Sequence, residues 1–283
     1  MEKIAIVTGS SSGFGLYICI ELAKAGFTVI ATMRDLSKKH VISNLNNEPL
    51  IQRRIRIVQL DVTDPQSIQT FQSYIQSLPS IDLLVNNAGF AQAGFVEEVN
   101  MNSYRKQFET NVYGTISITQ AVIPYMRVNQ SGTIIIMSSV SGCIGFPGLS
   151  AYVSSKHALE GFAESLRLEL APFHVNVALI EPGSYQTNIW KVGLTNIKGN
   201  EHSPYKTMLS SLQEHVKEAS PTYGHPKEVA QLIVKLAQKK KVKQLRYPIG
   251  KGVRIQLLFK KFIPWPLWQK LVLNRIRMKN NKI

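Results

Sequence analysis

The chain has 283 residues, of which 44% are apolar and 18% are charged, a composition that supports a large buried core. This composition excludes a disordered or collagen-like chain. No apolar run approaches the roughly 18–20 residues that a membrane-spanning helix needs, and no secretory signal precedes the first apolar run. Cys19 and Cys143 are the only cysteines, so we expect neither a disulfide framework nor a cysteine metal site. We therefore expect a soluble, cytoplasmic protein.

The formal net charge of +15 is unevenly distributed along the chain. Residues 229–283 contain 15 of the 33 basic side chains and none of the 18 acidic ones, so the residues up to Glu228 are neutral overall. The excess charge therefore belongs to the C-terminal segment alone. For this reason the high isoelectric point does not indicate a nucleic-acid-binding domain.

Apolar runs of strand length alternate with segments of helical periodicity along the chain. Strands are predicted at residues 4–8, 28–33, 55–60, 83–86, 133–138 and 175–181. Helices are predicted at residues 14–25, 65–77, 101–128, 150–171 and 226–238. Because most of the strands are continuously apolar, we expect them to be parallel and covered on both faces. The alternation predicts an α/β fold, a doubly wound parallel sheet with helices on both faces.

A turn rich in glycine, Thr8-Gly9-Ser10-Ser11-Ser12-Gly13-Phe14-Gly15, joins the first predicted strand to the first helix. Glycines in such a turn let backbone N–H groups approach a pyrophosphate at the positive end of a helix. An ordinary turn is the alternative on these residues alone, but two further strand ends also suit a nucleotide. The predicted nucleotide contacts are Gly9, Ser11, Ser12, Gly13, Phe14, Gly15, Asp61, Val62, Asn87, Ala88 and Gly89.

Six motifs follow one another in the chain: the glycine turn, Asn86-Asn87-Ala88-Gly89, Asn111, Ser139, Tyr152-x-x-x-Lys156 and Pro182-Gly183. Together they resemble the short-chain dehydrogenase/reductase family over about residues 3–250. The resemblance implies a single-domain Rossmann-like fold and an oxidoreductase that uses a nicotinamide cofactor. It also implies a homodimer or homotetramer in which the helices at 101–128 and 150–171 pair between subunits.

Tyr152 and Lys156 are four residues apart on a predicted helix, so they share one face. An ammonium one turn away favours the phenolate and lowers the pKa of the tyrosine, which suits Tyr152 to general acid and base catalysis. The ammonium of Lys156 can also hold the nicotinamide ribose. Ser139 can donate to the substrate oxygen as charge develops, and Ser138 is the competing candidate. The resemblance implies that Asn111 positions a water for proton relay.

Each of these residues has an ordinary alternative when it is taken alone. A lone Tyr-x-x-x-Lys is usually a surface pair, and a serine at a strand end is an unremarkable hydroxyl. The six histidines show no ligand spacing and hydride transfer needs no metal, so we expect no metal site. The rival function is a non-catalytic, nucleotide-sensing regulator that uses the basic tail. The presence of all four catalytic positions argues against that rival.

The residues at the end of the second predicted strand bear on the choice of cofactor. A carboxylate there would bind the ribose 2′-hydroxyl, whereas an arginine accommodates a 2′-phosphate. Met33 occupies the usual acidic position and Arg34 follows it, which favours NADP(H) over NAD(H). Asp35 is the counter-evidence, since a shift of one residue would reverse this choice.

Residues 184–223 break the alternation and are predicted to form a substrate flap. Pro182 and Gly183 begin this flap and are predicted cofactor contacts, and Thr187 matches the family residue that contacts the carboxamide. Residues suited to an apolar pocket are Phe146, Leu149, Tyr185, Trp190, Tyr205, Met208 and Leu209. Among these, Phe146 and Trp190 are the predicted substrate contacts beside Ser139 and Tyr152. The predicted substrate is a hydrophobic ketone or aldehyde or its alcohol, although these side chains could equally pack only under the flap.

The catalytic domain is predicted to end at residue 252, and residues 253–283 form a basic, amphipathic extension. Apolar residues recur at near-helical spacing from Trp265 onward, with basic residues between them. A cationic helix with aromatic side chains suits the surface of an anionic bilayer, which suggests peripheral membrane contact. The slightly favoured alternative is docking on the domain itself or on a partner subunit. Nucleic acid is a weaker third partner, since the aromatic residues favour an apolar surface.

Overall fold

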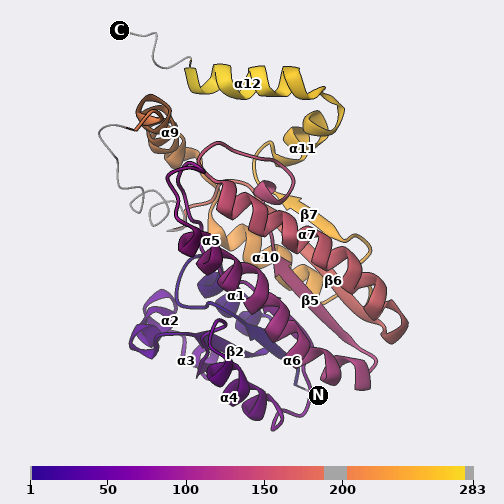
Figure 1. Cartoon of the computed structure of the whole chain (residues 1–283). Coiled ribbons are helices and arrows are strands. Elements are labelled where there is room, and N and C mark those ends of the chain that lie inside the picture. Colours follow the sequence, from indigo (N-terminus) through magenta and orange to yellow (C-terminus); the bar gives the residue numbers. More distant parts are fainter. Residues whose placement is uncertain (1, 188–202, 278–283) are drawn as a thin grey trace.

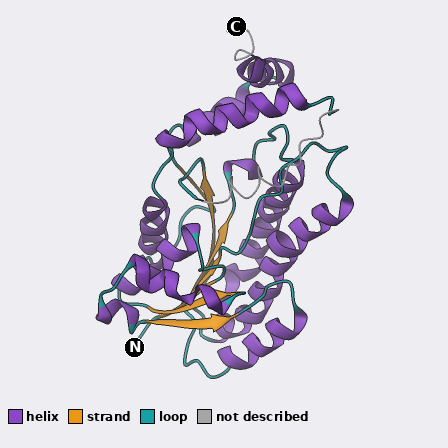
Figure 2. Ribbon diagram, turned by 90° about the vertical axis from the view of Figure 1, so that its left-hand side faces the viewer, coloured by secondary structure: helices purple, strands orange, loops and turns teal. Residues whose placement is uncertain are grey.

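The computed structural model describes residues 2–187 and 203–277, which form one seven-stranded parallel sheet with helices on both faces (Figure 1, Figure 2). The strands are β1 Ile4–Val7, β2 Thr28–Met33, β3 Ile55–Gln59, β4 Leu83–Asn86, β5 Gly132–Met137, β6 Val175–Pro182 and β7 Arg246–Ile249. Their spatial order is β3-β2-β1-β4-β5-β6-β7, so the direction of winding reverses between β1 and β4. The predicted single-domain, doubly wound, Rossmann-like fold is confirmed.

The α-helices alternate with the strands over most of the chain. They are α1 Gly13–Lys24, α2 His40–Leu45, α3 Pro49–Gln52, α4 Pro65–Ile75, α5 Met101–Phe108, α6 Gly114–Val128, α7 Ser150–Leu170, α9 Lys206–Ala219, α10 Pro226–Ala237, α11 Val253–Phe262 and α12 Trp265–Arg277. Short 3-10 turns are η1 Leu36–Lys39, η3 Val140–Gly142, η4 Ala171–Phe173 and η5 Ser220–Thr222. None of the helices in the described part of the chain is both long enough and apolar enough to cross a bilayer.

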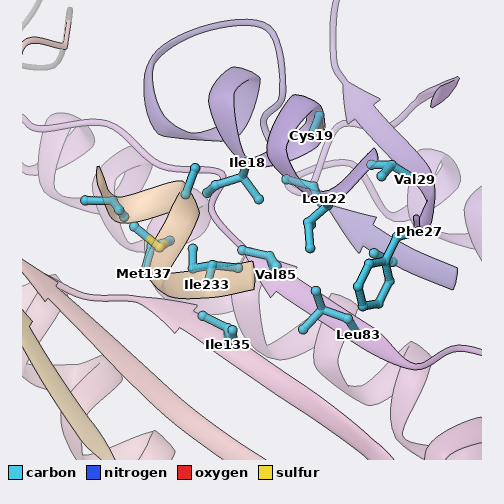
Figure 3. Packing of buried hydrophobic residues seen from close by; sticks show 14 of the residues in the cluster. Ile18, Cys19, Leu22, Phe27, Val29, Leu83, Val85, Ile135, Met137 and Ile233 are labelled. Carbon is cyan, nitrogen blue, oxygen red and sulfur yellow. The ribbon is translucent and has the colours of Figure 1, made fainter. Parts of the chain in front are cut away.

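The strands are apolar throughout because both faces of the sheet are covered. In β1 all four residues are buried, and successive side chains point to opposite faces. Ala5 and Val7 pack with α1 and α10 in one core cluster, whereas Ile4 and Ile6 pack with α4, α6 and α7 in the other. Figure 3 shows the first cluster, in which Ile18 of α1 and Ile233 of α10 meet the strands.

One predicted helix, at 101–128, is interrupted in the structure. A π-helical segment, η2 Glu109–Tyr113, separates α5 from α6 and carries Asn111. A π segment inserts an extra residue into the turn and shifts the faces of the helix, and such segments are frequent at functional sites. Hydrophobic periodicity predicts the helix but not this local change in pitch.

Several short elements were not predicted. η1, α2 and α3 lie between β2 and β3, and β7 is a half-buried edge strand of four residues. The predicted flap, 184–223, contains the helix α9, of which Ser211 is the one buried residue among those described. η1, α2, α3 and β7 are short and carry few buried apolar residues, so their sequences show little periodicity.

The C-terminal helices lie at the end of the molecule where the parallel strands finish. β7 pairs with β6 up to Pro182 and Ile249, and α11 begins shortly afterwards at Val253. α12 then packs against α9, so that α9, α11 and α12 gather at the end opposite the N-terminus (Figure 1). The carboxyl ends of the strands are where ligands bind in sheets of this kind, so these helices border the expected site.

Candidate active site

The glycine turn that follows β1 forms a close-fitting cradle at the amino end of α1. Gly9 and Gly13 have φ values of +67° and +54°, a left-handed backbone that glycine adopts without strain. The N-cap, Ser12, makes no side-chain hydrogen bond to the first turn of α1, so its side chain does not occupy those backbone donors. The geometry and polarity of this cradle fit a pyrophosphate.

Asn87 and Thr8 hold this turn in place. The Asn87 Nδ2 donates to the carbonyl oxygens of Thr8 at 2.9 Å and of Gly9 at 3.0 Å. The Thr8 hydroxyl accepts from the backbone N–H groups of Asn87 and Ala88, each at 2.9 Å. Asn87 was predicted as a direct cofactor contact. Its amide also ties the end of β4 to the glycine turn, a role that the sequence did not reveal.

The loops after β2 and β3 define the other end of the crevice. Met33 is 1% exposed and belongs to the core, whereas the Arg34 side chain is 79% exposed. The Nε of Arg34 lies 3.9 Å from a carboxylate oxygen of Asp61. Asp35 turns away, because its carboxylate accepts from the Ser37 N–H at 3.0 Å and caps η1. Arg34 is therefore the exposed cation at this strand end, and its partner is the Asp61 carboxylate. Val62, the residue after Asp61, is buried against the start of α6.

The structure brings Ser139, Tyr152 and Lys156 together in a buried site. All three are less than 8% exposed, and Tyr152 and Lys156 project from the buried face of α7. Ser139 forms a side-chain hydrogen bond with Tyr152, and its hydroxyl also lies 3.5 Å from the Pro182 carbonyl. The Lys156 Nζ donates to the Met137 carbonyl at 2.6 Å and lies 5.6 Å from the centre of the Tyr152 ring.

Burial controls the protonation of both titratable groups of this site. It raises the pKa of Tyr152 to about 12, and the hydrogen bond with Ser139 lowers that pKa by a smaller amount. Burial also lowers the pKa of Lys156 to about 8, and the negative charge of Glu160 raises it. The sequence favoured a phenol made acidic by Lys156, but in this structure burial has the larger effect. The Tyr152 phenol is therefore protonated at neutral pH.

Ser138, the competing serine, faces a different group. Its hydroxyl donates to Glu160, which lies one helical turn beyond Lys156 on α7. Because Ser138 and Ser139 are consecutive residues at a strand end, their side chains point in opposite directions. Among these two serines, only Ser139 is hydrogen-bonded to Tyr152.

Glu160 belongs to a buried acidic cluster that the sequence did not reveal. The Nε of Arg246 lies 2.8 Å from Glu160 and 3.6 Å from Glu181, and Cys143 lies 3.6 Å from Glu181. The pKa of Glu181 is raised to about 7, first by burial and then by the charge of Glu160. Glu160, Glu181 and Cys143 each offer one atom that could bind a metal ion, and these atoms lie within 4.8 Å of one another. The Arg246 guanidinium supplies the positive charge that balances the carboxylates. The cluster therefore supports β5, β6, β7 and α7 around Lys156.

Asn111 is held by the loop after β4. Its Oδ1 accepts from the Phe90 N–H, and its Nδ2 donates to the Phe90 carbonyl, both at 3.1 Å. The same Nδ2 lies 3.2 Å from the hydroxyl of Ser155 on α7. The polar atoms of the Asn111 amide are thus paired in the core, with the loop after β4 and with α7. Gly89 allows this approach, since a Cβ there would lie 3.0 Å from Asn111 Oδ1.

The structure brings only part of the predicted substrate and flap residues to the site. The methyl group of Thr187 lies against Gly13, 3.7 Å from the position that a Cβ on Gly13 would occupy. The Gly183 N–H donates to the Ile249 carbonyl at 2.9 Å. Phe146 is half-buried in the loop before α7, whereas Trp190 lies outside the described residues. Tyr185 packs into the core beside Phe14 with ring centres 5.4 Å apart, so it is unsuited to line a substrate pocket.

Tyr205, one of the predicted pocket residues, pairs at the edge of the flap with Phe95, which the sequence did not single out. Phe95 stacks on Tyr205 with ring centres 4.3 Å apart and an interplanar angle of 13°. The Gly94 N–H donates to the Gly148 carbonyl at 2.8 Å and joins this loop to the segment that carries Phe146. The site thus combines a glycine-rich cradle, a buried protonated phenol and apolar side chains, an arrangement typical of a nucleotide-dependent oxidoreductase.

Comparisons with known proteins establish the family. The sequence model of the short chain dehydrogenase family matches residues 3–196. The oxidoreductase YusZ of Bacillus subtilis (strain 168), itself uncharacterized, is 49% identical over 281 residues, which cover 97% of this chain and 99% of YusZ. A 3-ketodihydrosphingosine reductase of Bacteroides thetaiotaomicron is 32% identical and covers 93% of both chains. The structure of ElxO with NADP bound has a TM-score of 0.74 and 26% identity, covering 90% of this chain and 100% of ElxO.

The chain therefore belongs to the short-chain dehydrogenase/reductase family, as its motifs predicted. It is an NAD(P)-dependent oxidoreductase that uses a nicotinamide nucleotide and acts on a small molecule.

Proposed function

We propose that this protein reduces a hydrophobic ketone or aldehyde to its alcohol with NADPH as the cofactor. The observation that carries the proposal is the buried Ser139–Tyr152–Lys156 arrangement beside the glycine cradle. The bound cofactor supplies a hydride to the carbonyl carbon. Tyr152 donates its proton to the carbonyl oxygen, and Ser139 orients that oxygen by a hydrogen bond as negative charge develops.

Lys156 and Asn111 serve the proton donor and the cofactor in this proposal. The raised pKa of Tyr152, about 12, supports reduction because the phenol is protonated at neutral pH. In this proposal the Lys156 ammonium, which donates to the Met137 carbonyl, also holds the nicotinamide ribose. Asn111 positions a water through which Tyr152 regains its proton. The rival function, a non-catalytic nucleotide sensor, does not need the four groups in this arrangement.

Three features support a hydrophobic substrate. Phe95 and Tyr205 form a stacked pair at the flap. Phe146 lies in the loop that contains Gly148, whose carbonyl accepts from the Gly94 N–H beside Phe95. Apolar side chains of this kind enclose ligands by excluding water. One relative is named for the reduction of 3-ketodihydrosphingosine, a long-chain lipid ketone.

We also propose a homodimer or homotetramer formed through α6 and α7. Val128 on α6 and Leu168 on α7 are each 77% exposed in the single chain. Both helices pack in the same core cluster on one face of the sheet, and apolar side chains exposed on their outer sides fit a subunit interface.

The function is tested by an NADPH-oxidation screen over carbonyl compounds graded in size and polarity. We expect turnover to rise with the apolar size of the carbonyl compound, with long aliphatic, steroid-like and retinoid-like ketones or aldehydes as the best substrates. The measurement is the decrease in NADPH absorbance under initial-rate conditions for each compound. Turnover confined to small, highly polar ketones or sugars would contradict the hydrophobic substrate, and turnover of none would contradict the enzymatic function.

Arg34→Ala tests the cofactor preference. We expect the KM for NADPH to rise about tenfold or more, because a charge-assisted hydrogen bond to the 2′-phosphate contributes about 1.5–3 kcal/mol. The KM for NADH should change little, since NADH lacks that phosphate. Arg53→Ala removes another exposed arginine and serves as the matched control. The preference for NADPH would be ruled out if the protein used NADH and NADPH with equal catalytic efficiency and Arg34→Ala left both efficiencies unchanged.

A further inference from the structure

Helix α11 presents an apolar stripe to solvent. Ile255, Leu258, Phe259 and Phe262 are spaced as i, i+3, i+4 and i+7, so they share one face of the helix. Their side chains are 62%, 58%, 58% and 75% exposed. A stripe with this spacing normally faces a protein core, but this one lies outside it. We call these four residues the α11 stripe.

Basic residues surround the α11 stripe. Arg254 and Lys261 are exposed on α11, and Lys251 is exposed immediately before it. The Nζ of Lys261 lies 5.9 Å from the centre of the Phe262 ring, and that of Lys260 lies 4.4 Å from the Trp265 ring. No acidic residue occurs anywhere in the sequence from residue 229 to residue 283. The surface of α11 therefore combines bulky apolar side chains with several basic ones.

The two helices are anchored to the domain by other residues. At the start of α11, Val253 is 3% exposed and lies directly over Gly183. A Cβ on Gly183 would lie 2.5 Å from the Cγ2 of Val253. On α12, Trp268 is 9% exposed, and this helix packs against α9. Docking on the domain and membrane contact were the two predicted alternatives, and the structure shows docking for Val253 and Trp268 but not for the α11 stripe. The α11 stripe stays uncovered by the described part of the chain.

The charge of this surface selects among its possible occupants. A second copy of the chain in a two-fold contact would place the same cationic patch against itself, which like charges oppose. Nucleic acid would satisfy the positive charge but would leave the apolar stripe without a partner. An anionic lipid bilayer satisfies both, because its phosphate headgroups attract lysine and arginine and its acyl boundary accepts apolar side chains.

We propose that α11 and the beginning of α12 bind the surface of an anionic lipid bilayer, with the α11 stripe inserted at the acyl boundary. Trp265, 61% exposed, and Leu267, 49% exposed, extend the inserted surface at the start of α12. The neighbouring lysines and arginines then lie at the level of the lipid phosphates. Binding of this kind is peripheral and reversible, because a short amphipathic helix buries only one of its faces.

The position of this surface links it to the active site. α11 begins against Gly183, where the flap begins, and α12 packs against the flap helix α9 (Figure 1). A bilayer bound to α11 therefore lies beside the flap. Provided that the proposed reduction of a hydrophobic carbonyl is correct, the substrate is an amphipathic lipid ketone or aldehyde that enters from the bilayer rather than from water.

Vesicle flotation of the full-length protein tests the membrane surface. Phosphatidylcholine vesicles with and without phosphatidylglycerol are the probes, and we expect binding to the anionic vesicles that weakens as salt concentration rises. Phe262→Ser should weaken binding roughly tenfold, since it removes a large inserted side chain. Leu50→Ser is the matched control because Leu50 is 74% exposed on α3, compared with 75% for Phe262, and it should bind as the unaltered protein does.

Three outcomes would overturn the membrane surface. The first is absence of binding to anionic vesicles, and the second is equal binding by Phe262→Ser and Leu50→Ser. The third is an oligomer that forms without lipid and dissociates in Phe262→Ser, because it would assign the α11 stripe to contact with a second copy of the chain. The Tyr152→Phe variant should bind vesicles fully, so a failure of the proposed reaction is distinguished from a failure of membrane binding. If a lipid ketone is reduced equally fast in the presence and absence of anionic vesicles, entry from the bilayer is wrong.

Discussion

Tyr152→Phe is expected to lower kcat for carbonyl reduction by about three orders of magnitude. The substitution removes the one hydroxyl that is hydrogen-bonded to Ser139 beside Lys156, while the ring that fills the buried space is kept. The carbonyl oxygen would then have no positioned proton donor as the hydride arrives. The measurement is the single-turnover rate with saturating NADPH and the best substrate from the carbonyl screen.

The affinity of this variant for NADPH should remain within a few-fold of the unaltered protein, because the glycine cradle does not involve the phenol. Tyr104→Phe is a matched control, since the Tyr104 hydroxyl lies 2.5 Å from the Ser150 hydroxyl at the start of the same helix, α7. We expect it to retain nearly full activity. Full turnover by Tyr152→Phe would show that another group supplies the proton.

Gly15→Ala is expected to disrupt cofactor binding most severely among substitutions in the glycine turn. A Cβ at this position would lie 2.5 Å from Asn87 Nδ2 and closer still to the Gly9 carbonyl oxygen. Neither neighbour can yield easily, because the Asn87 amide is hydrogen-bonded to the Thr8 and Gly9 carbonyls. The turn must therefore shift, and its backbone N–H groups leave the positions that a pyrophosphate requires.

We expect the affinity for NADPH to fall about 10- to 100-fold and the free energy of unfolding to decrease by about 1–3 kcal/mol, the usual cost of overpacking. Titration calorimetry and denaturant unfolding measure the two effects separately. Gly161→Ala is the control, because no atom lies within 4 Å of a Cβ at this exposed position on α7. That substitution should increase stability by about 0.5–1 kcal/mol. Unaltered NADPH affinity in Gly15→Ala would contradict the cradle as the phosphate site.

Prediction from the sequence was most accurate for the parts that depend on local periodicity. The strands at Ile4–Val7 and Leu83–Asn86 and the helix Pro65–Ile75 lie within a residue or two of their predicted bounds. Continuous apolar runs and a clear Asp64-Pro65 start explain this accuracy, and Asp64 caps α4 by accepting from Gln66 N–H at 3.1 Å.

Prediction was least accurate where a short segment depends on distant neighbours. β7 has only half-buried residues and becomes a strand because it pairs with β6 at the edge of the sheet. The π-helical segment carries Asn111, whose amide bonds to Phe90, 21 residues away. Neither feature leaves a periodic signal in its own sequence.

The order and spacing of the motifs were enough to determine the family, the doubly wound sheet and the pairing of Tyr152 with Lys156. These properties follow from alternating strands and helices and from residues four apart on one helix face, which are local in the chain. The tertiary structure alone decided which serine bonds to Tyr152, which charges meet around Glu160, and that the α11 stripe faces outward. Those outcomes depend on burial and on contacts between residues far apart in sequence, such as Glu160 and Arg246, and a pattern of neighbouring residues does not encode them.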